Sequence, residues 1–348
     1  MDNIINITVE TNTVVRILSL GFLGFALSMA ITPIYSGMAY RGKWWKKPRQ
    51  NATTGEKATV FSALHAGKHA RNIPTMAGLI FVLSTLAVTM LFNLERTETW
   101  LPLAALIGAA CVGSIDDIIN IRGSGLGLAG LSGKLKMFLI SSVAFVGGWF
   151  FYAKLDVQSL SIPFMGNVHI GWLIVPLFVL VVVSTANAVN ITDGLDGLAG
   201  GLCVSAFAVY ALIAFIQQRY GVSAFCMTVV GGLLSYTWFN IFPARFFMGD
   251  IGSFALGTAL GVVAMITDTV VLLPVIGIIF VVEAGSSVLQ ITSKKLRGGK
   301  KIFKIAPIHH HFEAIGWPEA KVTMRFWILG QVASVIGLLL FLLGTGKR

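Results

Sequence analysis

Residues 171–217 read GWLIVPLFVLVVVSTANAVNITDGLDGLAGGLCVSAFAVYALIAFIQ, two apolar runs joined by a short polar turn. The runs, 171–189 and 198–217, each have about the 20 residues that a helix needs to cross the hydrocarbon core of a bilayer. The segment between them contains Asp193, Asp196 and several glycines. This pattern predicts two membrane-spanning helices whose connecting turn carries acidic side chains at one membrane face.

The rest of the chain has the same apolar character. Of 348 residues, 55% are hydrophobic and 12% are charged, with a mean hydropathy of +0.81, whereas average soluble domains carry about 25% charged residues. We therefore expect an all-α polytopic membrane protein, a single integral membrane domain over residues 1–348. About ten transmembrane helices are predicted, at roughly 14–36, 75–94, 100–116, 135–154, 171–189, 198–217, 222–240, 252–267, 270–290 and 325–344.

Positive charge predicts the orientation of these spans. The loops after odd-numbered spans include the basic segments 41–49, 67–71 and 293–304, and the opposite loops are nearly balanced in sign. Because Lys and Arg collect in cytoplasmic loops, we expect these loops in the cytoplasm and both termini outside. Residues 155–170 alternate polar and apolar side chains around a Gly-Asn pair, which predicts a small periplasmic hairpin.

The net charge of +11 suits anionic lipids and phosphorylated substrates. No nucleic-acid-binding motif is present, so we expect membrane lipid and no nucleic acid as a partner.

Four polar clusters fall on the predicted cytoplasmic side. They are Asp116 and Asp117 at the end of the third span, Asp193 and Asp196 in NAVNITDGLDGLAGG (187–201), Asp250 in FMGDIGS (247–253), and His309, His310 and His311 in PIHHHFE (307–313). A role as a helix cap would explain Asp250 but none of the other residues. A simple turn would explain the glycines of 187–201 but not the acids beside them. A zinc site would explain the histidines alone. Carboxylates that hold Mg²⁺ together with substrate phosphates account for the set.

Phosphoryl transfer is the chemistry that fits this set. Acids would hold the metal, Lys and His would bind phosphates, and the apolar spans would form a groove for a lipid acceptor. No Walker motif is present, so the donor must itself be activated, as a nucleotide sugar is. A polyprenyl phosphate from the bilayer and a nucleotide sugar from the cytosol meet only at the inner interface.

With IPTMAG (73–78) and DDIIN (116–120), these motifs give the chain a family likeness over about residues 65–325. The chain resembles the polyprenyl-phosphate N-acetylhexosamine-1-phosphate transferases, and PIHHHFE favours their muramoyl-pentapeptide branch. The resemblance implies transfer of phospho-MurNAc-pentapeptide from UDP-MurNAc-pentapeptide to undecaprenyl phosphate. Lipid I and UMP would form with Mg²⁺ as cofactor, in peptidoglycan synthesis at a bacterial inner membrane. The family also suggests a homodimer, for which no interface is readable in the sequence.

The resemblance also implies roles for individual residues. Asp116, Asp117, Asp250 and His309 are expected to be catalytic, with Asp250 the principal Mg²⁺ ligand and Asp116 the base that deprotonates or positions the lipid phosphate. The expected substrate-binding residues are Lys68, Thr75, Lys136, Asn187, Asn190, Thr192, Asp193, Asp196, Asn240, Phe247, Gln290, His310 and His311. Phe247 would stack on uracil.

The sequence departs from the family pattern at two positions. Ala77 replaces a Gly, and Asn120 replaces the Lys that normally follows the acidic pair. Arg122 and Lys134 are the candidates to supply the missing cation.

Three other functions are compatible with parts of the pattern. They are transfer of GlcNAc-1-phosphate from UDP-GlcNAc, secondary transport and a structural membrane role. Transport is disfavoured because transporters place their acids near the bilayer midplane. Direct attack by the lipid phosphate is our hypothesis, although a covalent aspartyl route would use the same residues.

Overall fold

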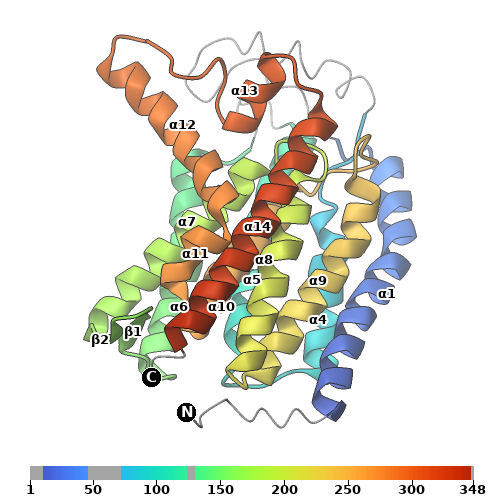
Figure 1. The fold of residues 1–348 in the computed structure, drawn as a ribbon. Helices are drawn as coiled ribbons and strands as arrows, with labels where there is room; N and C mark the ends of the chain where they lie inside the picture. The colour runs from blue at the N-terminus through green and yellow to red at the C-terminus, as the bar shows by residue number, and fades with distance from the viewer. Residues whose placement is uncertain (1–10, 46–71, 124–129, 346–348) are drawn as a thin grey trace.

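The computed structural model describes residues 11–45, 72–123 and 130–345 (Figure 1). Lys68 and most of the basic segments 41–49 and 67–71 therefore lie outside the described residues. The longer helices are α1 (Thr11–Arg41), α4 (Gly78–Phe92), α5 (Trp100–Arg122), α6 (Gly133–Ala153), α7 (Ile174–Thr192), α8 (Leu198–Ile216), α9 (Tyr220–Asn240), α10 (Gly249–Ile266), α12 (Ile278–Leu296) and α14 (Glu319–Thr345). Shorter elements are β1 (Ser159–Ile162), β2 (Gly166–His169), η1 (Gly171–Leu173), η2 (Val270–Leu272), α11 (Leu273–Ile276) and α13 (Ile308–Ala314).

Each predicted span coincides with helical structure, which confirms an all-α polytopic membrane protein. Among the described residues, eight helices are long and apolar enough to cross a membrane, and α4, with 15 residues, is shorter. The span predicted at 270–290 is not one straight helix. Its two halves, Val270–Ile276 and α12, are bent by 81°. The break falls at Gly277, whose low helix propensity makes it a ready point of interruption.

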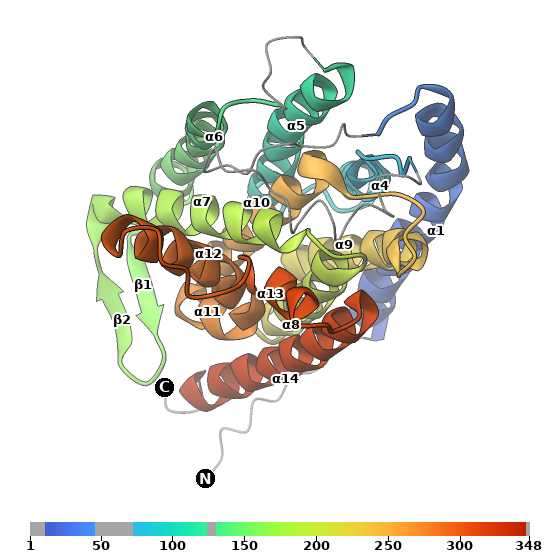
Figure 2. The same ribbon diagram turned by 90° about the horizontal axis from the view of Figure 1, so that it is seen from above.

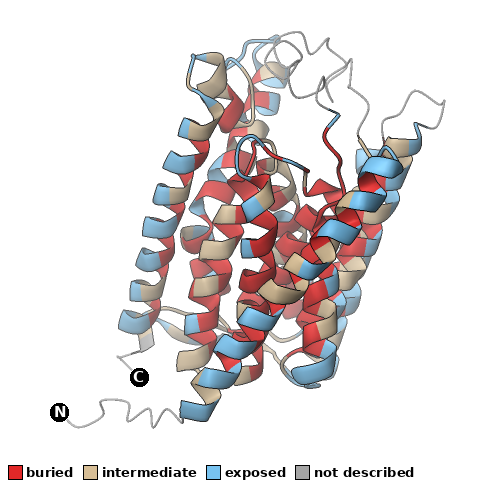
Figure 3. Cartoon of the chain, turned by 90° about the vertical axis from the view of Figure 1, so that its right-hand side faces the viewer, coloured by how far each residue is buried: buried red, intermediate tan, exposed pale blue. Residues whose placement is uncertain are grey.

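Helix α10 forms the centre of the molecule (Figure 2). All 18 of its residues are buried, and it packs against α5, α7 and α4. Gly257 and Gly261 lie directly against the α7 backbone at Ala186 and Val182, because small residues let membrane helices approach closely. The outer helices α1, α6 and α14 instead turn many exposed apolar side chains outward, as lipid-facing helices do (Figure 3).

The two ends of the helix bundle differ. The start of α1, the end of α14 and the β1–β2 hairpin lie together at one end, and α13 lies at the other (Figure 1). The hairpin is antiparallel, with Ile162 opposite Gly166, and the backbone N–H of Ser161 donates to Asp268 Oδ1 at 2.8 Å. The predicted hairpin is therefore confirmed, and it lies at the same end of the bundle as the start of α1 and the end of α14.

Candidate active site

Three buried carboxylates from two adjacent helices meet at the end of the bundle that carries α13. Asp116 and Asp117 lie on α5, which continues to Arg122 rather than ending at the acidic pair as predicted. Asp250 is the second residue of α10. One oxygen from each lies within 4.8 Å of the others. We call these three residues the acidic cluster. Such a group of hard oxygen ligands could hold a metal ion.

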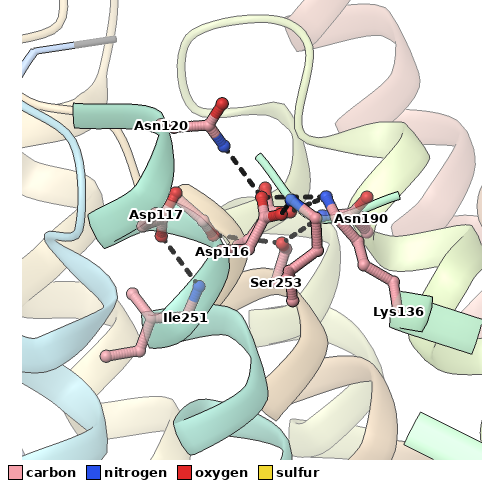
Figure 4. A network of polar contacts seen from close by, with 10 residues as sticks. Asp116, Asp117, Asn120, Lys136, Asn190, Ile251 and Ser253 are labelled. Carbon is pink, nitrogen blue, oxygen red and sulfur yellow. Dashed lines mark hydrogen bonds and ion pairs between the residues drawn. The ribbon is translucent and has the colours of Figure 1, made fainter. Parts of the chain in front are cut away.

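Lys136, near the start of α6, reaches into the acidic cluster (Figure 4). Its ammonium lies 2.7 Å from Asp250 Oδ2 and 2.9 Å from Asp116 Oδ2, with its side chain 19% exposed. Arg122 and Lys134, the two candidates for the missing cation, are both exposed, and their role stays a prediction. Lys136 and Lys134 are two residues apart and point to different sides of α6, so the rotation of this helix against α7 and α5 decides which lysine enters the site.

Backbone and amide donors hold the two α5 carboxylates in place (Figure 4). Asn120 Nδ2 donates to Asp116 Oδ2 at 2.8 Å, and the backbone N–H of Leu131 donates to Oδ1 at 2.7 Å. Asp117 Oδ2 accepts the backbone N–H of Ile251 at 3.0 Å. That N–H belongs to the first turn of α10, where backbone donors have no partner within the helix and negative charge is stabilised.

The segments IPTMAG and FMGD pair along their backbones beside the cluster. The N–H of Phe247 donates to Pro74 O at 2.8 Å, and the N–H of Ala77 donates to Phe247 O at 3.0 Å. Gly249 has φ +77°, and a methyl group there would strike the Asp117 carboxylate and lie 2.9 Å from Thr75 Oγ1. Glycine is therefore required at this position by backbone conformation and by space. Thr75 is buried at this junction, and Phe247 is half-buried.

The turn between α7 and α8 is tied to several elements. Asn190 Nδ2 donates to Ser253 Oγ of α10 at 2.8 Å. Asp196 Oδ2 accepts the N–H of Ala244 at 3.0 Å, and Asn240 Oδ1 accepts that of Gly197 at 2.9 Å. Helix α14 closes the other side, where Glu319 Oε1 accepts the N–H of Asp196. Asp196 and Asn240 therefore hold the loops in place, whatever they also contribute to substrate binding.

Thr192 and Asn187 of α7 bond to carbonyls of their own helix, and Asn187 Nδ2 also lies 3.6 Å from Met137 Sδ on α6. Thr192 Oγ1 donates to Ala188 O and Asn187 Nδ2 donates to Val183 O. Asp193 ends α7 and is half-buried.

The three histidines lie on helix α13. His309 is fully buried, with Nδ1 2.7 Å from Glu283 Oε2 on α12. His310 packs against it with ring centroids 4.1 Å apart, and its Nδ1 lies 2.7 Å from Glu313 Oε2. His311 Nδ1 accepts the N–H of Lys304 at 3.1 Å.

Burial dominates the electrostatics of His310. It lowers the pKa of this imidazole from 6.5 to about 4, with neighbouring His309 acting in the same direction and Glu313 against it. His310 is therefore neutral at pH 7 and donates from Nδ1 to Glu313.

Gln290 and Glu283 extend the site along α12. Gln290 Oε1 accepts the N–H groups of Ile302 and Phe303, and its Nε2 donates to Phe303 O, so it fastens the loop that leads to α13. Glu283 was missed by the sequence analysis, although a signal existed. It is the one acid within the apolar run 270–290, and an ionisable residue in a membrane segment is a functional candidate by default.

Comparison with known proteins identifies the family of the chain. Residues 99–268 match the model of glycosyl transferase family 4. A phospho-N-acetylmuramoyl-pentapeptide-transferase of Chloroflexus aurantiacus is 39% identical over 341 residues, 94% of this chain and 90% of the relative. Proteins of the same name from Methylacidiphilum infernorum and Listeria monocytogenes are 36% and 39% identical, covering 91% and 76% of this chain and 88% and 82% of the relatives. The resemblance drawn from the motifs is thereby confirmed, and the chain belongs to the phospho-N-acetylmuramoyl-pentapeptide transferase family.

Proposed function

We propose that the chain transfers phospho-MurNAc-pentapeptide from UDP-MurNAc-pentapeptide to undecaprenyl phosphate, giving lipid I and UMP. An oxygen of the lipid phosphate bonds to the phosphorus that bears the sugar. The bond from that phosphorus to the bridging oxygen breaks, and its electron pair leaves with UMP. The observation that carries the proposal is the buried acidic cluster at one end of a helical membrane protein whose relatives bear this enzyme's name.

The acidic cluster fits a magnesium ion. Its three buried carboxylates converge within 4.8 Å, and the Lys136 ammonium already lies between two of them, so the space accepts a cation. We expect Asp250 to be the principal ligand, with Asp116 and Asp117 beside it, because Mg²⁺ takes carboxylates together with substrate phosphates. A bound Mg²⁺ would offset the negative charge of the diphosphate.

Asp116 is assigned to the lipid phosphate. Leu131 N–H and Asn120 Nδ2 hold its carboxylate in one orientation, which suits a group that positions or deprotonates an incoming oxygen. We expect Lys136 to turn from Asp116 and Asp250 towards a phosphate oxygen when substrate enters, because an ammonium pairs strongly with phosphate.

The donor would bind among the loops that surround the acidic cluster. Phe247 is half-buried there and offers a ring to uracil, and His309 lies beside the Asp193–Gly194 turn. The other residues proposed to contact substrate are Lys68, Thr75, Asn187, Asn190, Thr192, Asp193, Asp196, Asn240, Gln290, His310 and His311.

The hydrocarbon of the acceptor needs an apolar surface. A pocket of about 410 Å³ between α7, α11 and α12 is lined by Leu180, Val181, Leu273, Phe280 and Val288, among others. Gly277, at the break between α11 and α12, also lines it, and we assign the first isoprene units to this pocket. Because Lys and Arg collect on the cytoplasmic side of a membrane, we expect the end of the bundle that carries the acidic cluster to face the cytoplasm. The membrane would be the inner membrane of a bacterium. A homodimer and a single domain over the whole chain stay predictions.

Release of UMP by the purified protein in detergent tests the proposal. The assay contains undecaprenyl phosphate, Mg²⁺ and either UDP-MurNAc-pentapeptide or UDP-GlcNAc. We expect UMP from the muramoyl donor only, and none above background with Asp250→Ala. Asp156→Ala is the matched control, since Asp156 is an exposed acid beside the hairpin. Release of UMP from UDP-GlcNAc only would show that the chain transfers GlcNAc-1-phosphate instead. Release from neither donor would refute the proposed reaction.

A further inference from the structure

One face of helix α12 is polar and buried. Its residues are Glu283, Ser286, Gln290 and Ser293, at most 7% exposed. The spacings of three and four residues place these side chains on one helix face. Ser293 Oγ donates to Lys300 O at 2.9 Å, Gln290 binds Ile302 and Phe303 as described above, and Ser286 Oγ accepts the N–H of Ile308 at 3.0 Å. Segment 300–308 is thus held along this face as it runs towards α13.

Glu283 continues this series and contacts a side chain rather than only the backbone. Its Oε2 lies 2.7 Å from His309 Nδ1, and both side chains are 0% exposed. The carboxyl group also faces the backbone N–H groups of Ile308 and His309. An ionised carboxylate can only accept hydrogen bonds, so with Glu283 ionised the hydrogen of the pair belongs on His309 Nδ1.

The opposite edge of the same imidazole faces the α7–α8 turn. A methyl group on Gly194 would collide with His309 Nε2, so the ring lies directly against the turn that contains Asp193. With hydrogen on Nδ1, Nε2 presents a lone pair towards this turn. A carboxylate behind a histidine fixes tautomer and orientation in this way in many enzymes.

We propose that Glu283 is a positioning residue that acts through His309. Glu283 holds the imidazole as the Nδ1–H tautomer. It thereby directs Nε2 towards the donor substrate, UDP-MurNAc-pentapeptide, beside the Asp193–Gly194 turn. This inference rests on the proposed function for its catalytic consequence, but the tautomer itself is a property of the protein alone.

The tautomer is measured by ¹⁵N NMR of histidine-labelled protein, because protonated and unprotonated ring nitrogens have well separated shifts. The chain has six histidines, and loss of a signal in His309→Asn assigns His309. We expect hydrogen on Nδ1 in the wild type and in Glu283→Gln, whose amide oxygen can still accept. Glu283→Leu should populate both tautomers. Ser286→Ala is the matched control, since it removes a bond on the same helix face without touching the ring.

Kinetics separate positioning from loop anchoring. With Glu283→Leu, we expect kcat to fall about 100-fold, as for carboxylates behind metal-bound histidines, with KM for the donor changing less than about threefold. Glu283→Gln should recover most of kcat. In a His309→Asn background, Glu283→Leu should cost little more, because residues acting as a unit are not additive.

Hydrogen on Nε2 in the wild type would overturn the proposal, as would a tautomer distribution unchanged in Glu283→Leu. An equal loss of kcat from Glu283→Leu with and without His309 would also overturn it. Failure of UMP release in the wild type would refute the reaction and leave the NMR result standing.

Discussion

Replacing Lys136 by Met should destabilise the protein and make it more responsive to Mg²⁺. The Lys136 ammonium lies 2.7 Å and 2.9 Å from two buried carboxylates of the acidic cluster. At an effective dielectric constant of about 20, one such pair attracts by roughly 6 kcal/mol, much of which offsets desolvation. Removing one partner of a buried pair costs about 3 kcal/mol or more. For a chain of 348 residues, this corresponds to a fall in Tm on the order of 4 °C.

The assay is thermal unfolding in detergent, followed by tryptophan fluorescence with and without Mg²⁺. A ligand at 100 times its Kd stabilises by about 2.7 kcal/mol. In the wild type, the stabilisation by Mg²⁺ is reduced because the ion must displace the Lys136 ammonium. The Lys136→Met variant has no ammonium to displace, so Mg²⁺ should raise its Tm by more. Lys134→Met is the control, because Lys134 is exposed two residues earlier on the same helix. If both variants unfold within about 1 °C of each other and respond alike to Mg²⁺, the bridging role of Lys136 is refuted.

Three further predictions follow from individual contacts. Gly249→Ala should cost about 1–2 kcal/mol through its positive φ alone and should abolish UMP release by displacing the acidic cluster, which activity and circular dichroism together would reveal. Because the pKa of His310 falls to about 4 on folding, its contribution to stability is complete above about pH 6.5 and is lost as pH falls towards 4. Between these pH values the free energy of unfolding should change by about 1.4 kcal/mol per pH unit. Denaturant titrations at several pH values measure this dependence, which should be absent in His310→Asn. Asn120→Ala removes a hydrogen bond to a buried carboxylate and should slow UMP release about tenfold or more, whereas unchanged kinetics would show that the amide is dispensable.

Much of the fold was readable from the sequence because its signals are local. Runs of apolar residues long enough for a bilayer determine where helices form, and alternation around Gly166 determines the hairpin. The position of each acid or histidine within a loop or helix end also determines which end of the bundle it occupies. The acidic cluster, the Asp193–Asp196 turn and the histidines therefore fell at one end, as expected.

Partners across the bundle were decided only by tertiary structure. Sequence spacing could not show that Lys136, rather than Arg122 or Lys134, reaches Asp250, because the choice depends on how α6 is rotated against α7 and α5. The same holds for Glu283 and His309, which are 26 residues apart. Hydrophobicity determines that a segment is a buried helix, but the rotation and packing of neighbouring helices determine which polar atoms meet inside it.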